Sequence, residues 1–192
     1  MFHQGRRSLR AVIACPSRSP ATKSSLHRYM AMKILECSNE IRYPRRKHPH
    51  HRCSDSTNSN LPIFLTVCTK RRSSVLAHEL AHDALRDLWS DNSRWIVGLY
   101  VLMPEHAHLI VIEAARNRTP LSMWIGWWKQ QASARGGGGG LVWQRDFWDT
   151  TIGTQAMFAE KSAYIKNNPV KRGLVHAENE WPFQGEVYCI GL

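Results

Sequence analysis

The sequence predicts an α+β protein built on a ferredoxin-like antiparallel sheet with helices on one face, preceded by a disordered basic N-terminal arm. Two observations lead to this fold class. From residue 61 onward the hydrophobic patterns follow the order strand, helix, strand, strand, helix, strand, which is the ferredoxin-like connectivity. All eight tryptophans also follow residue 61. We therefore expect one folded domain over residues 60–192 and an extension over residues 1–59.

The extension carries most of the excess positive charge. Of the 26 Lys and Arg residues, 12 lie in residues 1–60, together with only 3 of the 15 Asp and Glu residues. A net charge of +11 favours a polyanionic partner, nucleic acid first. A cluster of potential zinc ligands also lies here, but its spacing matches no zinc module, so we expect a solvated arm instead (His48, His50, His51 and Cys53).

The cysteine and hydrophobic patterns favour a cytoplasmic protein. The five cysteines are scattered without a C-x-x-C pair, which is typical of reduced thiols. No apolar run approaches the roughly 20 residues of a membrane span. The short apolar run after Arg6-Arg7 does not meet the requirements of an export signal.

The first expected elements are a strand and an amphipathic helix. Leu61–Cys68 is rich in β-forming residues, and a basic cluster suited to phosphate groups, Lys70-Arg71-Arg72, follows it. Leucine and alanine then recur at helical spacing from Leu76 to Trp89. Within this helix, His78-Glu79-Leu80-Ala81-His82 fits the H-E-x-x-H pattern of zinc proteases. We reject that interpretation because the metzincin extension is absent.

Two apolar strands, Trp95–Met103 and Glu105–Ile112, are expected to form a hairpin that turns near Pro104. His106 and His108 lie in the second strand, where residues two apart point to the same face. Two imidazoles side by side on a buried strand are well placed to bind one divalent metal ion.

The remaining elements complete the predicted order. Thr119-Pro120 is a favourable helix start, and that helix is expected to run to about Arg135 with Trp124 and Trp128 in the core. Five glycines, residues 136–140, indicate a flexible connector. A short strand or extended loop, Leu141–Trp148, precedes a helix expected from Thr154 to about Asn168, where Pro169 would end it.

The last helix can complete a site with the two histidines. Tyr164 and Asn168 are four residues apart and share one helical face. If that face packs near the hairpin, two imidazoles, an amide oxygen and a phenol converge. A neutral phenol is a weak nucleophile, but beside a metal ion that polarises a phosphodiester it can attack phosphorus. Asn168 is open to a second interpretation, as the C-cap of its helix.

These residues resemble a known family. Met103-Pro104-Glu105-His106-Ala107-His108 is similar to the histidine-hydrophobe-histidine motif of the IS200-like single-tyrosine (HUH) transposases. Two further segments, residues 143–149 and 164–175, resemble the branch called REP-associated tyrosine transposases. The three motifs occur in the order and spacing of that family, and the resemblance extends from about residue 42 to residue 183.

The resemblance implies a Mg²⁺- or Mn²⁺-dependent endonuclease and strand transferase that acts in DNA transposition through a 5′-phosphotyrosine. It implies His106, His108 and Asn168 as metal ligands and Tyr164 as nucleophile. The implied partner is single-stranded DNA with hairpin or palindromic ends; a homodimer is an open alternative, and no membrane partner is expected. We expect seven basic side chains to contact DNA: Lys70, Arg71, Arg72, Lys129, Arg145, Lys171 and Arg172. For Lys129, a solvated helix face is the alternative.

The sequence also departs from the family pattern. Thr150 and Gly153 occupy positions where the family usually has histidine and arginine, and glycines replace the segment before Trp143. The alternative function is therefore that of an inactive or co-opted relative, which binds structured single-stranded nucleic acid without cleaving it.

Overall fold

The structure, a computed structural model, describes residues 61–91, 94–114, 119–135 and 141–191. The N-terminal extension, its histidine and cysteine cluster, and the glycine connector lie outside the described residues. In the part of the chain that is described, no helix is both long and apolar enough to cross a membrane.

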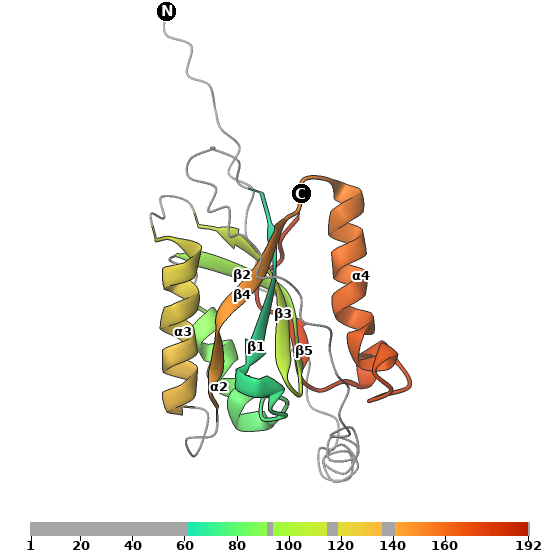
Figure 1. The fold of residues 1–192 in the computed structure, drawn as a ribbon. Helices are drawn as coiled ribbons and strands as arrows, with labels where there is room; N and C mark the ends of the chain where they lie inside the picture. The colour runs from blue at the N-terminus through green and yellow to red at the C-terminus, as the bar shows by residue number, and fades with distance from the viewer. Residues whose placement is uncertain (1–60, 92–93, 115–118, 136–140, 192) are drawn as a thin grey trace, which may run out of the picture.

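A five-stranded sheet forms the centre of the domain, with the strand order β4-β1-β3-β2-β5 and antiparallel pairing throughout (Figure 1). The first four strands have the order and connectivity of the predicted ferredoxin-like sheet, so the α+β fold class is confirmed. The fifth is a short edge strand in a segment that the sequence pattern predicts as a tail. The strands are β1 (Ile63–Thr69), β2 (Trp95–Met103), β3 (His106–Glu113), β4 (Trp143–Thr151) and β5 (Gln184–Glu186).

The three α-helices of the described residues are divided between the two faces of this sheet (Figure 1). The helices of the ferredoxin-like unit, α2 (Glu79–Trp89) and α3 (Leu121–Arg135), cover one face as expected. The last helix, α4 (Gln155–Lys171), covers the opposite face, which corrects the expectation that all helices lie on one face. Two short 3₁₀ segments complete the described elements, η1 (Lys70–Arg72) and η2 (Glu178–Glu180).

The cause of this arrangement is a sheet that is apolar on both faces. Strands β2 and β3 alternate side chains toward the two faces. Leu102 and Leu109 face α2 and α3, whereas Val101, Met103 and Ile110 face α4, and all five are fully buried. Because an uncovered apolar face would stay in contact with water, the sheet requires helices on each side.

Tryptophans fill the core between α2, α3 and the sheet. Trp124 and Trp128 are 1% and 0% exposed, which confirms their predicted place in the core. Trp128 makes edge-to-face contacts with Trp89 of α2 and with Trp143 of β4, at ring-centroid distances of 5.7 and 5.3 Å. These contacts join α2 and α3 to the edge of the sheet.

Helix α4 ends later than the sequence predicts. Pro169 lies inside it, and the helix continues to Lys171. The end is set by Gly173, whose φ of +66° is readily adopted only by residues without a side chain. The amides of Gly173 and Leu174 donate to the carbonyls of Val170 and Pro169, the pattern of a Schellman motif. A proline in the last turn is tolerated because only one hydrogen bond of the helix is lost there.

Candidate active site

The β2–β3 hairpin places the two histidines on the face that α4 covers. The turn is Pro104-Glu105, as predicted, and His106 begins β3. Cross-strand pairing sets His106 beside Cys68 of β1 and His108 beside Thr66. The turn is also fixed from the side of β1, because the carbonyl of Glu105 accepts hydrogen bonds from the amide and the hydroxyl of Thr69, each 3.0 Å long.

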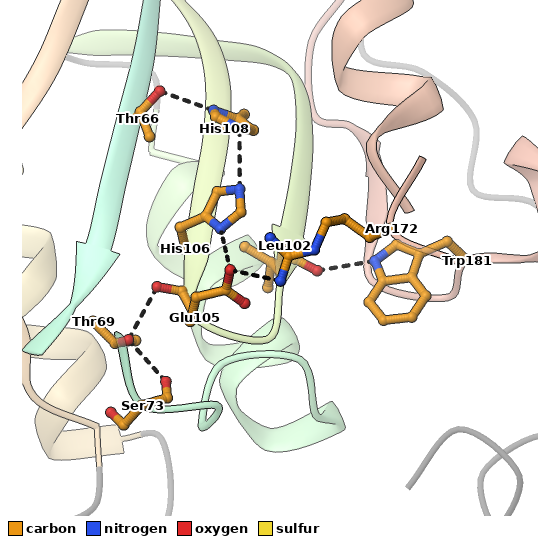
Figure 2. A network of polar contacts seen from close by, with 9 residues as sticks. All are labelled: Thr66, Thr69, Ser73, Leu102, Glu105, His106, His108, Arg172 and Trp181. Carbon is orange, nitrogen blue, oxygen red and sulfur yellow. Dashed lines mark hydrogen bonds and ion pairs between the residues drawn. The ribbon is translucent and has the colours of Figure 1, made fainter. Parts of the chain in front are cut away.

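The two imidazoles converge through the same ring nitrogen. His106 Nε2 lies 3.1 Å from His108 Nε2, and the side chains are 6% and 4% exposed. The opposite nitrogens are held by neighbouring groups (Figure 2). His106 Nδ1 lies 3.3 Å from Glu105 Oε1, and His108 Nδ1 lies 2.9 Å from Thr66 Oγ1. Each ring therefore has a fixed orientation that directs Nε2 toward the other ring.

The charge state of Glu105 determines where the protons lie. Although burial raises its pKa, the hydrogen bond from His106 and the positive charges of His106 and Arg172 outweigh this and lower the pKa to about 2. An ionised carboxylate accepts only, so His106 donates to it from Nδ1.

His108 is held in its neutral form. Burial lowers its pKa well below 6.5, and the positive charge of His106 lowers it further. A neutral imidazole is the form that binds metal ions. Because the Thr66 hydroxyl can either donate or accept, the proton of His108 can occupy either ring nitrogen, and Nε2 can be freed without loss of the bond to Thr66.

Tyr164 lies directly over this pair. Its ring centroid is 5.1 Å from that of His108 and 5.9 Å from that of Phe64, and both contacts are edge-to-face. The side chain is 39% exposed, so the phenol is open to solvent while its ring touches the buried histidine. Lys171 Nζ lies 5.4 Å from the tyrosine ring centroid. The predicted juxtaposition of the last helix and the histidine strand is present.

Asn168 lies one turn beyond Tyr164 on the same face of α4 and is 6% exposed. It is not the C-cap, because the helix continues for three more residues and Arg172 occupies that position. Among the described residues, no group of three or more His, Cys, Asp or Glu side chains could hold a metal ion. The Asn168 amide is a buried polar group on the helix that carries Tyr164.

The predicted DNA-contacting side chains fall into three groups. Lys171 and Arg172 lie at the end of α4, beside the tyrosine and Glu105. Lys70, Arg71 and Arg72 form η1 at the end of β1, and the charge of Arg72 contributes to the lowered pKa of His108. Both arginines of η1 have left-handed backbones, with φ of 57° and 56°. Such strained backbone is often found at functional sites.

The third group, Lys129 and Arg145, lies on the other side of the sheet. Both line a pocket of about 200 Å³ between α3 and β4. For Lys129 the predicted DNA contact is wrong. The side chain is 8% exposed, and Nζ donates to the carbonyls of Gln144 and Arg145 at 2.9 and 3.3 Å. The bulged edge strand β4 turns these carbonyls inward, and the lysine satisfies them. The alternative of a solvated helix face is also wrong for this lysine.

The H-E-x-x-H segment does not form a zinc site. Helix α2 begins at Glu79, so His78 is its N-cap, and His78 Nδ1 accepts from the amide of Ala81 at 3.4 Å. His82 Nε2 lies 2.9 Å from the hydroxyl of Tyr100. The two histidines therefore have separate structural partners, which supports the rejection of the protease interpretation.

Three residues around the histidines were not identified from the sequence. Thr66 and Glu105 orient the rings, and Phe64 stacks on His108 at a centroid distance of 5.2 Å. Alternation along β1 puts Phe64 and Thr66 on the same face of the sheet. That this is also the face of the histidines follows only from the register of β1 against β3. Glu105 is adjacent to the histidine motif, which was the available signal.

Comparisons with known proteins find relatives of this chain in sequence and in fold. No family model matches the chain. A curated relative, the "REP-associated tyrosine transposase" of Escherichia coli (strain K12), is 29% identical over 123 residues, which cover 62% of this chain and 73% of that protein.

A solved structure of a REP-associated tyrosine transposase bound to a REP hairpin superimposes with a TM-score of 0.55 and 26% identity. The match covers 74% of this chain and 81% of that one. The sequence motifs, the fold and these likenesses agree, and the chain is similar to the REP-associated tyrosine transposases in both sequence and fold.

Proposed function

We propose that this transposase-family protein is a metal-dependent endonuclease and strand transferase of single-stranded DNA that acts through a 5′-phosphotyrosine on Tyr164. The observation that carries the proposal is the position of Tyr164. A half-exposed phenol lies with its ring 5.1 Å from the ring of His108, above two buried imidazoles whose Nε2 atoms converge.

His106 and His108 would hold the divalent ion through their Nε2 atoms, which converge at 3.1 Å. Asn168, buried on the helix that carries Tyr164, would add an amide oxygen, a ligand type that suits Mg²⁺ or Mn²⁺. The ion would polarise the scissile phosphodiester.

The chain's own residues supply the nucleophile and neutralise charge. Tyr164 Oη forms a bond to the phosphorus while the bond from phosphorus to the 3′ oxygen breaks. The phenolic proton passes to solvent, and the leaving strand ends in a 3′ hydroxyl. The DNA remains joined to Tyr164 through its 5′ phosphate, and a second 3′ hydroxyl reverses the step in strand transfer. Lys171, beside the tyrosine ring, and the arginines of η1 are placed to offset the charge of the phosphate.

The structural relative is bound to a REP hairpin, and for this chain we propose single-stranded DNA next to a hairpin as substrate. An excess of 11 positive charges is consistent with a DNA partner, and binding should weaken steeply with salt.

The test is a covalent adduct on a denaturing gel after incubation with hairpin-bearing single-stranded DNA and Mg²⁺ or Mn²⁺. We expect an adduct for the wild type and for the control Tyr188→Phe, which loses only a hydrogen bond to the carbonyl of Ser90. We expect none for Tyr164→Phe, for His106→Ala, or without a divalent ion. The same adduct from Tyr164→Phe would refute the mechanism.

The alternative, binding without cleavage, is motivated by Thr150 and Gly153. Thr150 is exposed and pairs with Phe64, which places it on the sheet face of the histidines. Gly153 is exposed with open space around it. Both residues are exposed, so the absence of histidine and arginine at these positions changes the chemistry of the protein surface and not its packing. Tight, salt-sensitive binding of the hairpin with no adduct in any divalent ion would favour this alternative.

A further inference from the structure

One carboxylate oxygen touches both halves of the site. Glu105 Oε1 lies 3.3 Å from His106 Nδ1 and 3.1 Å from Arg172 Nη2 (Figure 2). Glu105 belongs to the β2–β3 turn, and Arg172 is the C-cap of α4. The ion pair therefore links the strand hairpin that carries the histidines to the helix that carries the tyrosine.

Both partners have a fixed backbone. The Glu105 side chain is 5% exposed, and its carbonyl accepts two hydrogen bonds from Thr69. At the other end, the amide of Arg172 donates to the carbonyl of Asn168 at 3.1 Å, and the left-handed Gly173 ends the helix immediately afterwards. The ion pair therefore connects two backbone segments that are each held by their own hydrogen bonds.

The position of Arg172 along α4 relates it to the tyrosine. Tyr164, Asn168 and Arg172 are spaced four residues apart, so they lie along one side of the helix that faces the sheet. Eight residues correspond to about 12 Å along the helix axis. Tyr164 contacts Phe64 and His108 of the sheet through edge-to-face ring contacts and is 39% exposed. Such ring contacts tolerate sliding and rotation, whereas a short ion pair at one end of the helix limits both.

We propose that the Glu105–Arg172 ion pair is a latch that sets the position of α4, and that Arg172 is a positioning residue that holds Tyr164 over His108. Glu105 serves both sides, because the oxygen that orients His106 also binds Arg172. The relevance of the latch to DNA cleavage rests on the proposed function; the latch itself is a property of the protein without DNA or metal.

The test compares Arg172→Gln with Arg172→Lys and with Lys166→Gln, which removes a cation from an exposed position of the same helix. The first measurement is amide hydrogen exchange of residues 165–171. We expect Arg172→Gln to exchange at least tenfold faster than the wild type and Lys166→Gln to exchange within twofold of it.

The second measurement is the chemical shift of the His108 ring protons, which the edge-to-face tyrosine ring perturbs. We expect Arg172→Gln to move these signals toward their position in Tyr164→Leu, Lys166→Gln to leave them unchanged, and Arg172→Lys to give an intermediate shift. Unchanged His108 signals and unchanged exchange in Arg172→Gln would overturn the proposal. If Arg172→Gln does not fold, Glu105→Gln gives the same comparison from the other side, with the same two expected changes.

A third measurement separates the latch from a direct DNA contact by Arg172. The latch predicts that Arg172→Gln keeps hairpin affinity within about threefold while adduct formation falls at least tenfold, with substantial recovery in Arg172→Lys. Equal losses of affinity and adduct would identify a phosphate contact and overturn the latch. If the wild type forms no adduct, the proposed function fails, whereas the exchange and NMR results still decide the latch.

Discussion

The buried position of Lys129 determines how its contribution to the free energy of unfolding changes with pH. Burial lowers the pKa of its amine from 10.5 to about 8. Between these values the unfolded chain holds a proton that the folded chain has released, so the contribution of Lys129 to stability rises with pH. Titration from pH 8 to pH 10 should raise the free energy of unfolding of the wild type by about 2 kcal/mol relative to Lys129→Met.

Urea unfolding followed by tryptophan fluorescence measures this difference at each pH, because buried tryptophans pack around α3. Lys166→Met, at an exposed position of α4, is the control and should show no such trend. A constant difference between the wild type and Lys129→Met from pH 8 to pH 10 would refute a buried, desolvated amine. Hairpin DNA affinity at pH 7 should be the same in both proteins, because Lys129 binds carbonyls of β4.

Two further substitutions test the site and the fold. Thr66→Val removes the hydroxyl that holds His108 Nδ1, so the affinity for Mn²⁺, measured by calorimetry, should fall roughly 10- to 100-fold. Thr66→Ser keeps a hydroxyl and should retain the affinity. Equal affinity in the wild type and both variants would show that the hydroxyl is dispensable. Gly173→Ala places a side chain on a backbone with φ of +66° and should lower the free energy of unfolding by about 1 kcal/mol or more. Gly153→Ala, at an ordinary φ with open space around it, is the control and should leave the free energy of unfolding nearly unchanged. Similar urea midpoints for the two variants would contradict the assignment of the helix end.

The fold was largely predictable because its signals are local. Alternation and helical spacing identify the strands and helices from residue 61 onward, and β-α-β-β-α-β order implies the sheet. The errors have local causes as well. Pro169 is a strong breaker in isolation, but it occupies a last turn that Gly173 ends two residues after Lys171. The expectation that all helices lie on one face was wrong, because the sheet buries apolar side chains on both faces.

The site was predictable only in part, because its supporting contacts cross between elements. His106, His108 and Tyr164 carry chemistry that spacing and motif reveal. Thr66 joins them only through the register of β1 against β3, a relation between residues 42 positions apart. Lys129 shows the opposite case, in which a basic residue on a helix is buried by a bulge in a distant strand.

The most direct measurement of the central claim is mass spectrometry of the DNA adduct after nuclease and trypsin digestion. Cleavage after Lys161 and Lys166 releases residues 162–166, a peptide whose only tyrosine is Tyr164. We expect a nucleotide linked through its 5′ phosphate to this peptide, formed only with Mg²⁺ or Mn²⁺ and absent from His108→Ala. A nucleotide on any other peptide, or an adduct that forms equally without the histidine pair, would contradict a tyrosine activated at this site.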